Sequence, residues 1–178
     1  IVGDATMYAG VVVSPTCASV TISNNIISGM ALSNPGNDSP LSYGILAYGN
    51  SSSEMPVGLT FSGNEIFYVA GAAISLGSYT YATTITGNYL HDIIPVEFLG
   101  EQFSVGVQSE FAGALSVEGN TFGNLFIGTS LLASEGSVSG NAYNNVASLH
   151  TSTYPSYVVF DEEIAWWQIF STVNYLDQ

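Results

Sequence analysis

The residues of this sequence that could carry chemistry are almost all acidic. The chain of 178 residues has 14 Asp and Glu, two His and no Lys or Arg, which gives a formal net charge of −14 at pH 7. Ordinary proteins carry both signs of charge on about a quarter of their residues, whereas the charged fraction here is 8%. Because no carboxylate can pair with a Lys or Arg of its own chain, each must be hydrated, bonded to backbone N–H groups, bound to metal or protonated.

The densest group of acids is Asp161, Glu162 and Glu163. Calcium prefers several oxygen ligands, among them carboxylates, and the chain has no Lys or Arg to neutralise these side chains. The three residues are therefore the candidate metal ligands, and Ca²⁺ is the only cofactor that the sequence suggests. The alternative is that they form a solvated strand end.

Paired carboxylates and histidines are the other candidates for catalysis. Two carboxylates that flank a sugar bond can act as general acid and base, and Glu97, Glu101, Glu110 and Glu118 could supply such a pair. The alternative is that these acids are solvated. His91, next to Asp92, and His150 have no nucleophile at a recognisable spacing. We therefore expect ordinary surface or corner histidines and no catalytic residue.

Three further residues are candidates for covalent modification. Cys17 is the only cysteine, so it is either a buried small hydrophobic residue or half of an intermolecular disulfide in an exported protein. Asn50, in Asn-Ser-Ser, and Asn37, in Asn-Asp-Ser, begin glycosylation sequons. Pro40 weakens the second sequon.

The composition argues against two classes of partner. Phosphate backbones and anionic membrane surfaces are bound through Lys and Arg, which this chain lacks. No apolar run reaches the roughly 18 residues that a membrane-spanning helix needs. We expect no nucleic acid and no membrane insertion. The chain starts at Ile1, and we expect a processed or trimmed product at the cell surface or outside the cell.

An eleven-residue pattern recurs along the chain and would position the candidate residues named above. It consists of any residue, Ser or Thr, an apolar residue, any residue, Gly or Asn, Asn, any residue, an apolar residue, two of any kind and an apolar residue. The five copies are VTISNNIISGM (20–30), LTFSGNEIFYV (59–69), TTITGNYLHDI (83–93), LSVEGNTFGNL (115–125) and GSVSGNAYNNV (136–146). A repeat of a little over 20 residues with variable insertions indicates a solenoid.

Each position of the pattern has a physical role. The apolar third residue points inward from a short strand, and its Ser or Thr neighbours point outward. The Gly or Asn at position five suits a left-handed bend. The Asn at position six can hydrogen-bond along the stack to its equivalents about 4.8 Å away. The expected structural ladder is Asn25, Asn64, Asn88, Asn120 and Asn141.

A second family of strands follows the pattern. Its members are expected at 8–14, 43–49, 71–77, 105–110, 127–133 and 157–162, which gives five full turns and a partial first one. The insertions at 33–42, 49–58 and 95–103 are rich in Pro, Gly, Asn and Ser or interrupt the repeat, and are expected to be loops. Trp166 and Trp167 belong to an expected cap or contact segment at about 161–178.

The copies TISNNII, TFSGNEI and TITGNYL resemble the turn of the right-handed parallel β-helix repeat family, over about residues 8–160. The resemblance implies an all-β, right-handed parallel β-helix of about five to six turns in a single domain, 1–178. Pectate lyases of this family use a basic residue, usually Arg, with Ca²⁺ held by Asp, and its pectin esterases also use Arg. This chain has no Arg, and its five Asp residues match no such cluster.

The function expected first is that of a structural, self-assembling protein of a cell sheath, surface layer or filament. Proteins usually protect open sheet edges with charged residues, especially Lys. This chain has no Lys and few charged residues of any kind. Its composition and repeat type most resemble the archaeal sheath proteins of methanogens. The expected partner is therefore another copy of the same chain.

Two alternatives stay open from the sequence. The first is a carbohydrate-active or carbohydrate-binding β-helix, which a long acidic groove lined by aromatic residues would favour. The second is an ice-binding solenoid, because Ser and Thr form two outward columns. These columns are Thr21, Thr60, Thr84, Ser116 and Ser137, and Ser23, Ser62, Thr86, Glu118 and Ser139. Glu118 interrupts the second column.

Overall fold

The computed structural model describes residues 1–4, 7–30, 42–98, 101–153, 157–160 and 169–171, and this part of the chain consists of strands and turns without a helix. The strands are β1 (Ala9–Val13), β2 (Thr21–Ser23), β3 (Ile26–Ser28), β4 (Ser42–Ala47), β5 (Val57–Ser62), β6 (Glu65–Phe67), β7 (Gly71–Leu76), β8 (Thr80–Thr86), β9 (Tyr89–His91), β10 (Val96–Phe98), β11 (Glu101–Phe103), β12 (Val105–Glu110), β13 (Ala112–Gly113), β14 (Leu115–Glu118), β15 (Thr121–Leu132), β16 (Glu135–Ser139), β17 (Ala142–Thr153), β18 (Tyr157–Phe160) and β19 (Ile169–Ser171).

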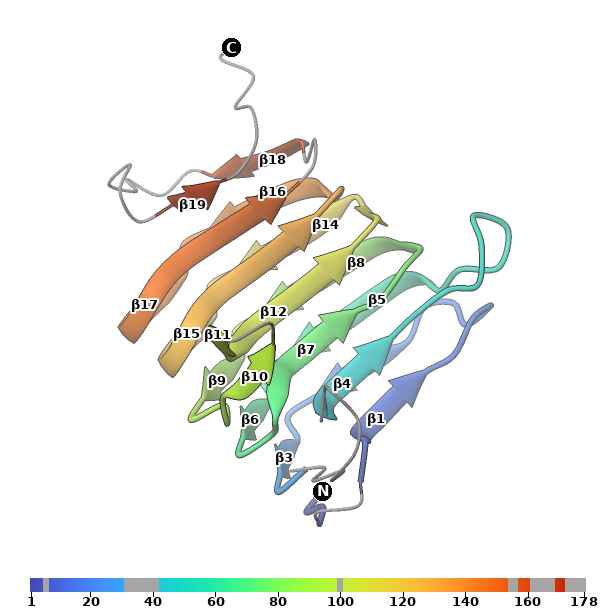
Figure 1. Ribbon diagram of the computed structural model, residues 1–178. Coiled ribbons are helices and arrows are strands. Elements are labelled where there is room, and N and C mark those ends of the chain that lie inside the picture. Colours follow the sequence, from blue (N-terminus) through green and yellow to red (C-terminus); the bar gives the residue numbers. More distant parts are fainter. Residues whose placement is uncertain (5–6, 31–41, 99–100, 154–156, 161–168, 172–178) are drawn as a thin grey trace.

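The strands stack in three faces, and β1 and β19 lie at opposite ends of the stack (Figure 1). The first face contains β2, β5, β8, β14, β16 and β18. The second face contains β3, β6, β9 and the beginnings of β15 and β17, and the third contains β1, β4, β7, β12 and the ends of β15 and β17. All pairs within these faces are parallel, which confirms the expected parallel β-helix.

The register of the first face superposes the copies of the sequence pattern. Thr21 pairs with Thr60, Thr60 with Thr84, Thr84 with Ser116, and Ser116 with Ser137. The apolar residues of position three all point into the core, and so do most of those at positions eight and eleven. The buried members are Ile22, Phe61, Ile85, Val117 and Val138, then Ile27, Ile66, Leu90 and Phe122, then Met30, Val69, Ile93 and Leu125.

Two assignments made from the sequence are wrong. The segment 157–162 was expected on the third face, but β18 pairs with β16 and therefore continues the first face. The third-face strand of that turn is the end of β17, where Ser148 and His150 pair with Ile127 and Thr129. Its inward residues are polar, which hid the strand from an analysis based on apolar residues. The insertion 95–103 contains the antiparallel hairpin β10–β11.

Only part of the expected cap lies within the residues that the structure describes. At the end of the chain, β19 pairs with β17 and extends the third face. The remainder of the expected cap, with Trp166 and Trp167, lies outside the described residues. No helix long and apolar enough to cross a membrane occurs in the described part of the chain.

Candidate functional site

The first corner of each turn, between the first and second faces, is held by the asparagines of position six. The side-chain amides of the first four, Asn25, Asn64, Asn88 and Asn120, each donate to the Oδ1 atom of the Asn one turn later, over distances of 2.9–3.0 Å. The backbone N–H of each also donates to that Oδ1, and the amides of Asn64, Asn88 and Asn120 reach a backbone carbonyl one turn earlier. These three residues are 1% exposed. The three central members of the ladder are therefore structural and have no free surface for a ligand.

The second corner, between the second and third faces, carries a different set of polar residues. Position ten of the pattern lies here, and all five of its residues have a left-handed backbone. They are Gly29 (φ 83°), Tyr68 (φ 51°), Asp92 (φ 49°), Asn124 (φ 51°) and Asn145 (φ 55°). Gly, Asn and Asp enter this conformation at the lowest cost. Four of the five residues are of these types, so the bend, although not the groove beside it, could have been inferred from position ten.

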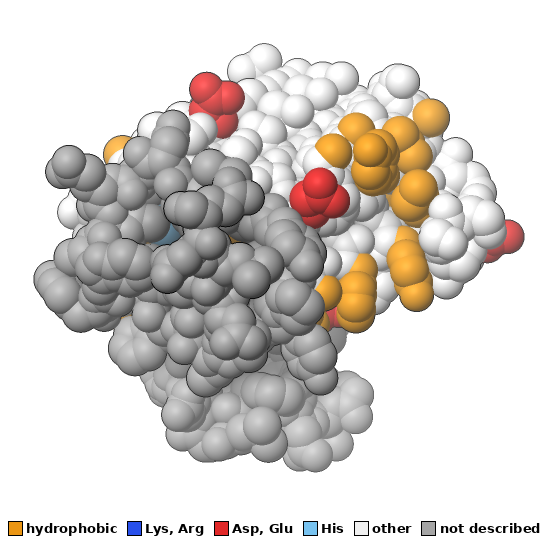
Figure 2. Space-filling model, turned by 90° about the horizontal axis from the view of Figure 1, so that it is seen from above, with side chains coloured by type: hydrophobic (Ala, Val, Ile, Leu, Met, Phe, Trp, Pro, Cys, Tyr) orange, Lys and Arg blue, Asp and Glu red, His pale blue; other side chains and the backbone are white. Residues whose placement is uncertain are grey.

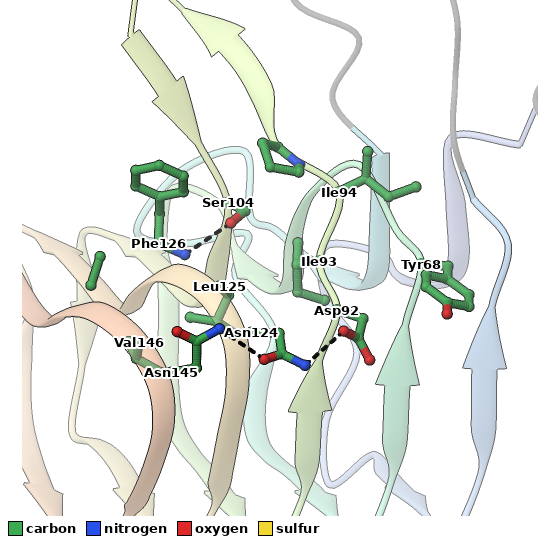
Figure 3. Close-up of a pocket in the computed structure, with 12 residues that line it drawn as sticks. Tyr68, Asp92, Ile93, Ile94, Ser104, Asn124, Leu125, Phe126, Asn145 and Val146 are labelled. Atoms are coloured by element: carbon green, nitrogen blue, oxygen red, sulfur yellow. Dashed lines mark hydrogen bonds between the residues drawn. The ribbon is translucent and has the colours of Figure 1, made fainter.

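The last three of these residues form a second ladder, which faces solvent. The Asn145 amide donates to Asn124 Oδ1 over 3.0 Å, and the Asn124 amide donates to Asp92 Oδ1 over 2.9 Å. Figure 3 shows the three side chains in one line across the turns. The side chains of this ladder are one turn apart, like those of the first-corner ladder, but its amides are exposed and remain open to a ligand.

His91 continues the exposed ladder toward the second face. Its Nδ1 lies 2.7 Å from Asp92 Oδ2, its Nε2 lies 3.3 Å from Glu65 Oε1, and its side chain is 12% exposed. The rings of Tyr89 and Phe67 stack on the imidazole at centroid distances of 3.9 and 5.1 Å. A neutral imidazole has one N–H donor and an imidazolium has two. The carboxylates of Asp92 and Glu65 can therefore accept hydrogen bonds from His91 at the same time only when the ring is protonated.

The pKa of the Asp92 carboxyl is lowered from its usual value. The hydrogen bond with His91 is the largest cause, followed by the hydrogen bond from Asn124, and both favour the charged form. The slight burial of Asp92 acts in the opposite direction, and the charge of His91 adds to the lowering. Asp92 is therefore an anionic acceptor at neutral pH rather than a proton donor.

A groove of about 520 Å³ runs along the second corner beside this ladder. One side is polar and consists of Asp92, Asn124 and Asn145 (Figure 3). The other side is apolar and includes Ile94 and Phe126, and Tyr68 lies at one end. The groove thus combines hydrogen-bonding groups, an apolar strip and two exposed aromatic rings.

The backbone beside the groove is fixed by the start of the third face. The buried Ser104 accepts a hydrogen bond from the Phe126 N–H through its hydroxyl, over 3.0 Å, and one from the Ile127 N–H through its carbonyl. The exposed Phe126 ring therefore projects from a rigid strand. The hairpin β10–β11 leaves the helix at Pro95, next to the same groove.

The carboxylates considered for acid–base catalysis are spread over different elements. Glu97 and Glu101 lie on β10 and β11, where only the backbone is described. Glu110 is on β12 of the third face, whereas Glu118 is exposed on β14 of the first face. The structure therefore does not bring Glu110 and Glu118 to one site.

The other residues proposed from the sequence lie apart from the groove. His150 is fully buried within β17, with its Nδ1 2.6 Å from Thr129 Oγ1, so the expected surface or corner position is wrong for this residue. Cys17 is half-buried and packs against the core near the start of the helix. Asn50 is exposed, and its amide donates to Glu54 over 3.1 Å.

Two of the candidate sites cannot be placed. Asn37 and the proposed Ca²⁺ ligands Asp161, Glu162 and Glu163 lie outside the described residues. Within the described ones, no three His, Cys, Asp or Glu side chains come together in a way that could hold a metal ion.

Comparison with known proteins agrees with this architecture. Searches of curated proteins and of solved structures found no match. The family model described as "Right handed beta helix region" matches residues 9–163, which is most of the chain and includes all five copies of the pattern. The chain therefore belongs to the right-handed β-helix family.

Proposed function

We propose that this protein is a structural, self-assembling component of a cell exterior, such as a sheath, surface layer or filament. The observation that supports the proposal is the open first turn. Among the described residues, β1 pairs only with β4 and β2 pairs only with β5, so the outer edges of both strands are unpaired. Tyr8 and Val12 are large exposed hydrophobic residues beside the open edge of β1, whereas the outer edge of β3 is paired with residues 1–3.

An open strand edge presents unpaired N–H and C=O groups that can template further β-structure. Natural edges are usually protected by charged residues, above all Lys, and no Lys can guard this one because the chain has none. The partner with matching strand spacing is a further β-helix turn from a second copy. Assembly end to end would bury both the edges and the apolar side chains.

The acidic composition makes such an assembly dependent on pH. With 14 acids and no Lys or Arg, copies repel one another at neutral pH, over about 8 Å at physiological salt. On the face that Figure 2 presents, the acidic side chains of the described residues stand singly among uncharged atoms. Protonation near pH 4 removes the repulsion, and Ca²⁺ bound at Asp161, Glu162 and Glu163 could bridge copies.

Light scattering and sedimentation between about pH 3 and 8, with Ca²⁺ or a chelator, test this function. We expect association to increase as the pH falls and when Ca²⁺ is added. Val12→Lys places a charge at the open edge and should suppress association. Tyr81→Lys, an equal charge change at an exposed residue of an interior turn, should not. A chain that stays monomeric under all conditions would disprove the proposal.

The proposed role is not enzymatic. It is supported by the separation of Glu110 from Glu118, which lie on different faces. It assigns no cofactor to the protein apart from Ca²⁺.

A further inference from the structure

The third corner, between the third and first faces, carries a short column of stacked aromatic rings. Tyr79 and Phe111 occupy equivalent positions in two successive turns, and both have a left-handed backbone, with φ of 63° and 52°. Their ring centroids lie 6.1 Å apart, with 20° between the ring planes. The next residue of the column, Ala133, has the same backbone conformation (φ 46°) but carries no ring. The stack therefore ends at Phe111.

A hollow of about 350 Å³ opens where the stack ends. Both rings line it, together with the small residues Gly113 and Ala133 and the acid Glu135. A Cβ atom added at Gly113 would lie 2.7 Å from Cδ2 of Tyr81, so a third ring borders the hollow. The site thus combines exposed aromatic rings, a space left by small side chains and one carboxylate.

We propose that this hollow binds an arginine side chain of a basic partner protein. The rings of Tyr79 and Phe111 are 40% and 52% exposed, and a cation over an aromatic face is attracted by the ring quadrupole. A guanidinium group is planar and stacks on aromatic rings, so it can continue the stack at the position where Ala133 supplies no ring. The Glu135 carboxylate, on the same turn as Ala133, can accept two of its N–H groups.

The charge of the chain favours a partner of a different composition over a second copy. With 14 acids and no Lys or Arg, a second copy has no guanidinium to supply and brings only further acids. Glu135 is exposed and Glu110, next to Phe111, is partly exposed, so a basic chain meets acids at this corner. The site lies on interior turns, and the end-to-end assembly proposed above neither requires it nor covers it.

The backbone that lines the hollow is held by hydrogen bonds between two turns. The buried Ser134 hydroxyl lies 2.7 Å from the Ser109 hydroxyl, accepts from the Ala112 N–H over 3.4 Å and donates to the Leu132 carbonyl over 3.0 Å. The Phe111 N–H donates to the same Leu132 carbonyl over 2.9 Å. The aromatic rings therefore stand on a fixed backbone, and rigid aromatic surfaces bind at a low cost in conformational entropy.

Isothermal titration calorimetry with matched peptides tests the site. Each peptide is a short Gly/Ser chain that carries a pair of arginines, of lysines or of citrullines, which are uncharged analogues of arginine. The titrations are run at about pH 8 with chelator and physiological salt, where we expect dissociated protein. The arginine peptide should bind about threefold more tightly than the lysine peptide, and the citrulline peptide should not bind measurably.

Three results of these titrations would overturn the proposal. Equal binding of the arginine and lysine peptides would show that only the overall acidity of the chain is recognised. Binding of the citrulline peptide as tight as that of the arginine peptide would mean that the rings take an uncharged partner. Binding of none of the peptides would leave the hollow without the proposed ligand.

A ring variant locates the preference for arginine. The double change Tyr79→Asn and Phe111→Asn removes the stack and keeps residues that tolerate the left-handed backbone. It should abolish the preference of the protein for the arginine peptide over the lysine peptide. The control is the double change Tyr68→Asn and Phe126→Ala, which removes two exposed rings at the second corner and should keep that preference. Loss of the preference in both variants, or in neither, would refute the assignment to the third corner.

A charge variant tests the carboxylate without altering the stack. Glu135→Gln should weaken binding of the arginine peptide at least about threefold, whereas Glu118→Gln, an equal change at an exposed acid of the first face, should not. Equal losses would contradict a local role of Glu135. Sedimentation of the ring variant at about pH 4 examines the other occupant. If its self-association were lost, a second copy would be the ligand of the rings and the proposal would be wrong.

Discussion

The first and second corners of this β-helix use the same backbone bend for different purposes. Both contain a column of left-handed residues, and both carry a ladder of side-chain amides along the axis. At the first corner the amides are buried and also bond to backbone groups of a neighbouring turn. At the second corner they are exposed. Burial, rather than residue type, therefore separates an amide that holds the fold from one that is available to a ligand.

The largest difference between the two corners should appear when a buried amide is removed. Asn88→Leu leaves the Asn64 N–H and the Phe61 carbonyl without their partners, at about 1–3 kcal/mol for each unsatisfied buried group. We expect the free energy of unfolding to fall by at least about 2 kcal/mol in denaturant titrations. Thr84→Ala, on the outer side of a first-face strand, should cost less than about 0.5 kcal/mol. Equal costs would contradict the assigned inward and outward directions.

A smaller effect is expected from the bend of the first corner itself. Gly87 has a φ of 62°, and an added Cβ atom would meet nothing within 4 Å. Gly87→Ala should therefore cost only the left-handed backbone penalty, about 1–2 kcal/mol. Gly63→Ala should cost more, because its Cβ would lie 2.6 Å from Asn24 Oδ1. Thermal unfolding of the two variants gives the comparison, and the reverse order would show that Asn24 moves freely.

The exposed ladder should contribute little to stability. Asn124→Gly removes the hydrogen bonds to Asp92 and Asn145 and keeps a residue that adopts a φ of 51° readily. We expect a change within about 0.5 kcal/mol in the free energy of unfolding, as at most exposed positions. A loss as large as that of Asn88→Leu would mean that the second corner is structural as well.

The smallest effect concerns pH. The pKa of Asp92 is lowered by His91 and Asn124 from its usual 3.8, so its contribution to stability is complete above that value and is lost as the pH falls through the lowered pKa. Asp92→Asn should be slightly less stable than the unmodified chain at neutral pH and equal to it in strong acid. Glu118→Gln, on the first face, is the control for charge. A pH-independent difference would contradict the proposed pairing with His91.

The sequence predicted the parts of the fold that repeat in residue type. The same Asn and the same inward apolar residue recur at fixed positions in all five copies, so the first corner and the core beneath it could be located before the structure was known. The third-face strand at the end of β17 was missed because its inward residues, such as Ser148 and His150, are polar. The assignment of 157–162 to that face was wrong for the same reason.

The groove could not be predicted in the same way. Its polar side depends on residues that share a backbone conformation rather than a type, since Tyr68 and Asp92 occupy the same position as Asn124. Its apolar side depends on the path of an insertion, because the chain leaves the helix at Pro95 to form β10–β11. Insertions interrupt the repeat, and a repeat pattern contains no information about where they fold.

The buried ladder also gives the molecule a direction. Every amide from Asn25 to Asn120 donates toward the C-terminal turn and none of these bonds runs the other way, so the amide dipoles add head to tail and can polarise one another. Any turn that extends the stack beyond Asn25 must present an N–H group to the Asn25 Oδ1 atom. Two copies joined through identical ends would place acceptor against acceptor. A fibre that continues this ladder must therefore be polar, with distinguishable ends and growth rates that differ between them.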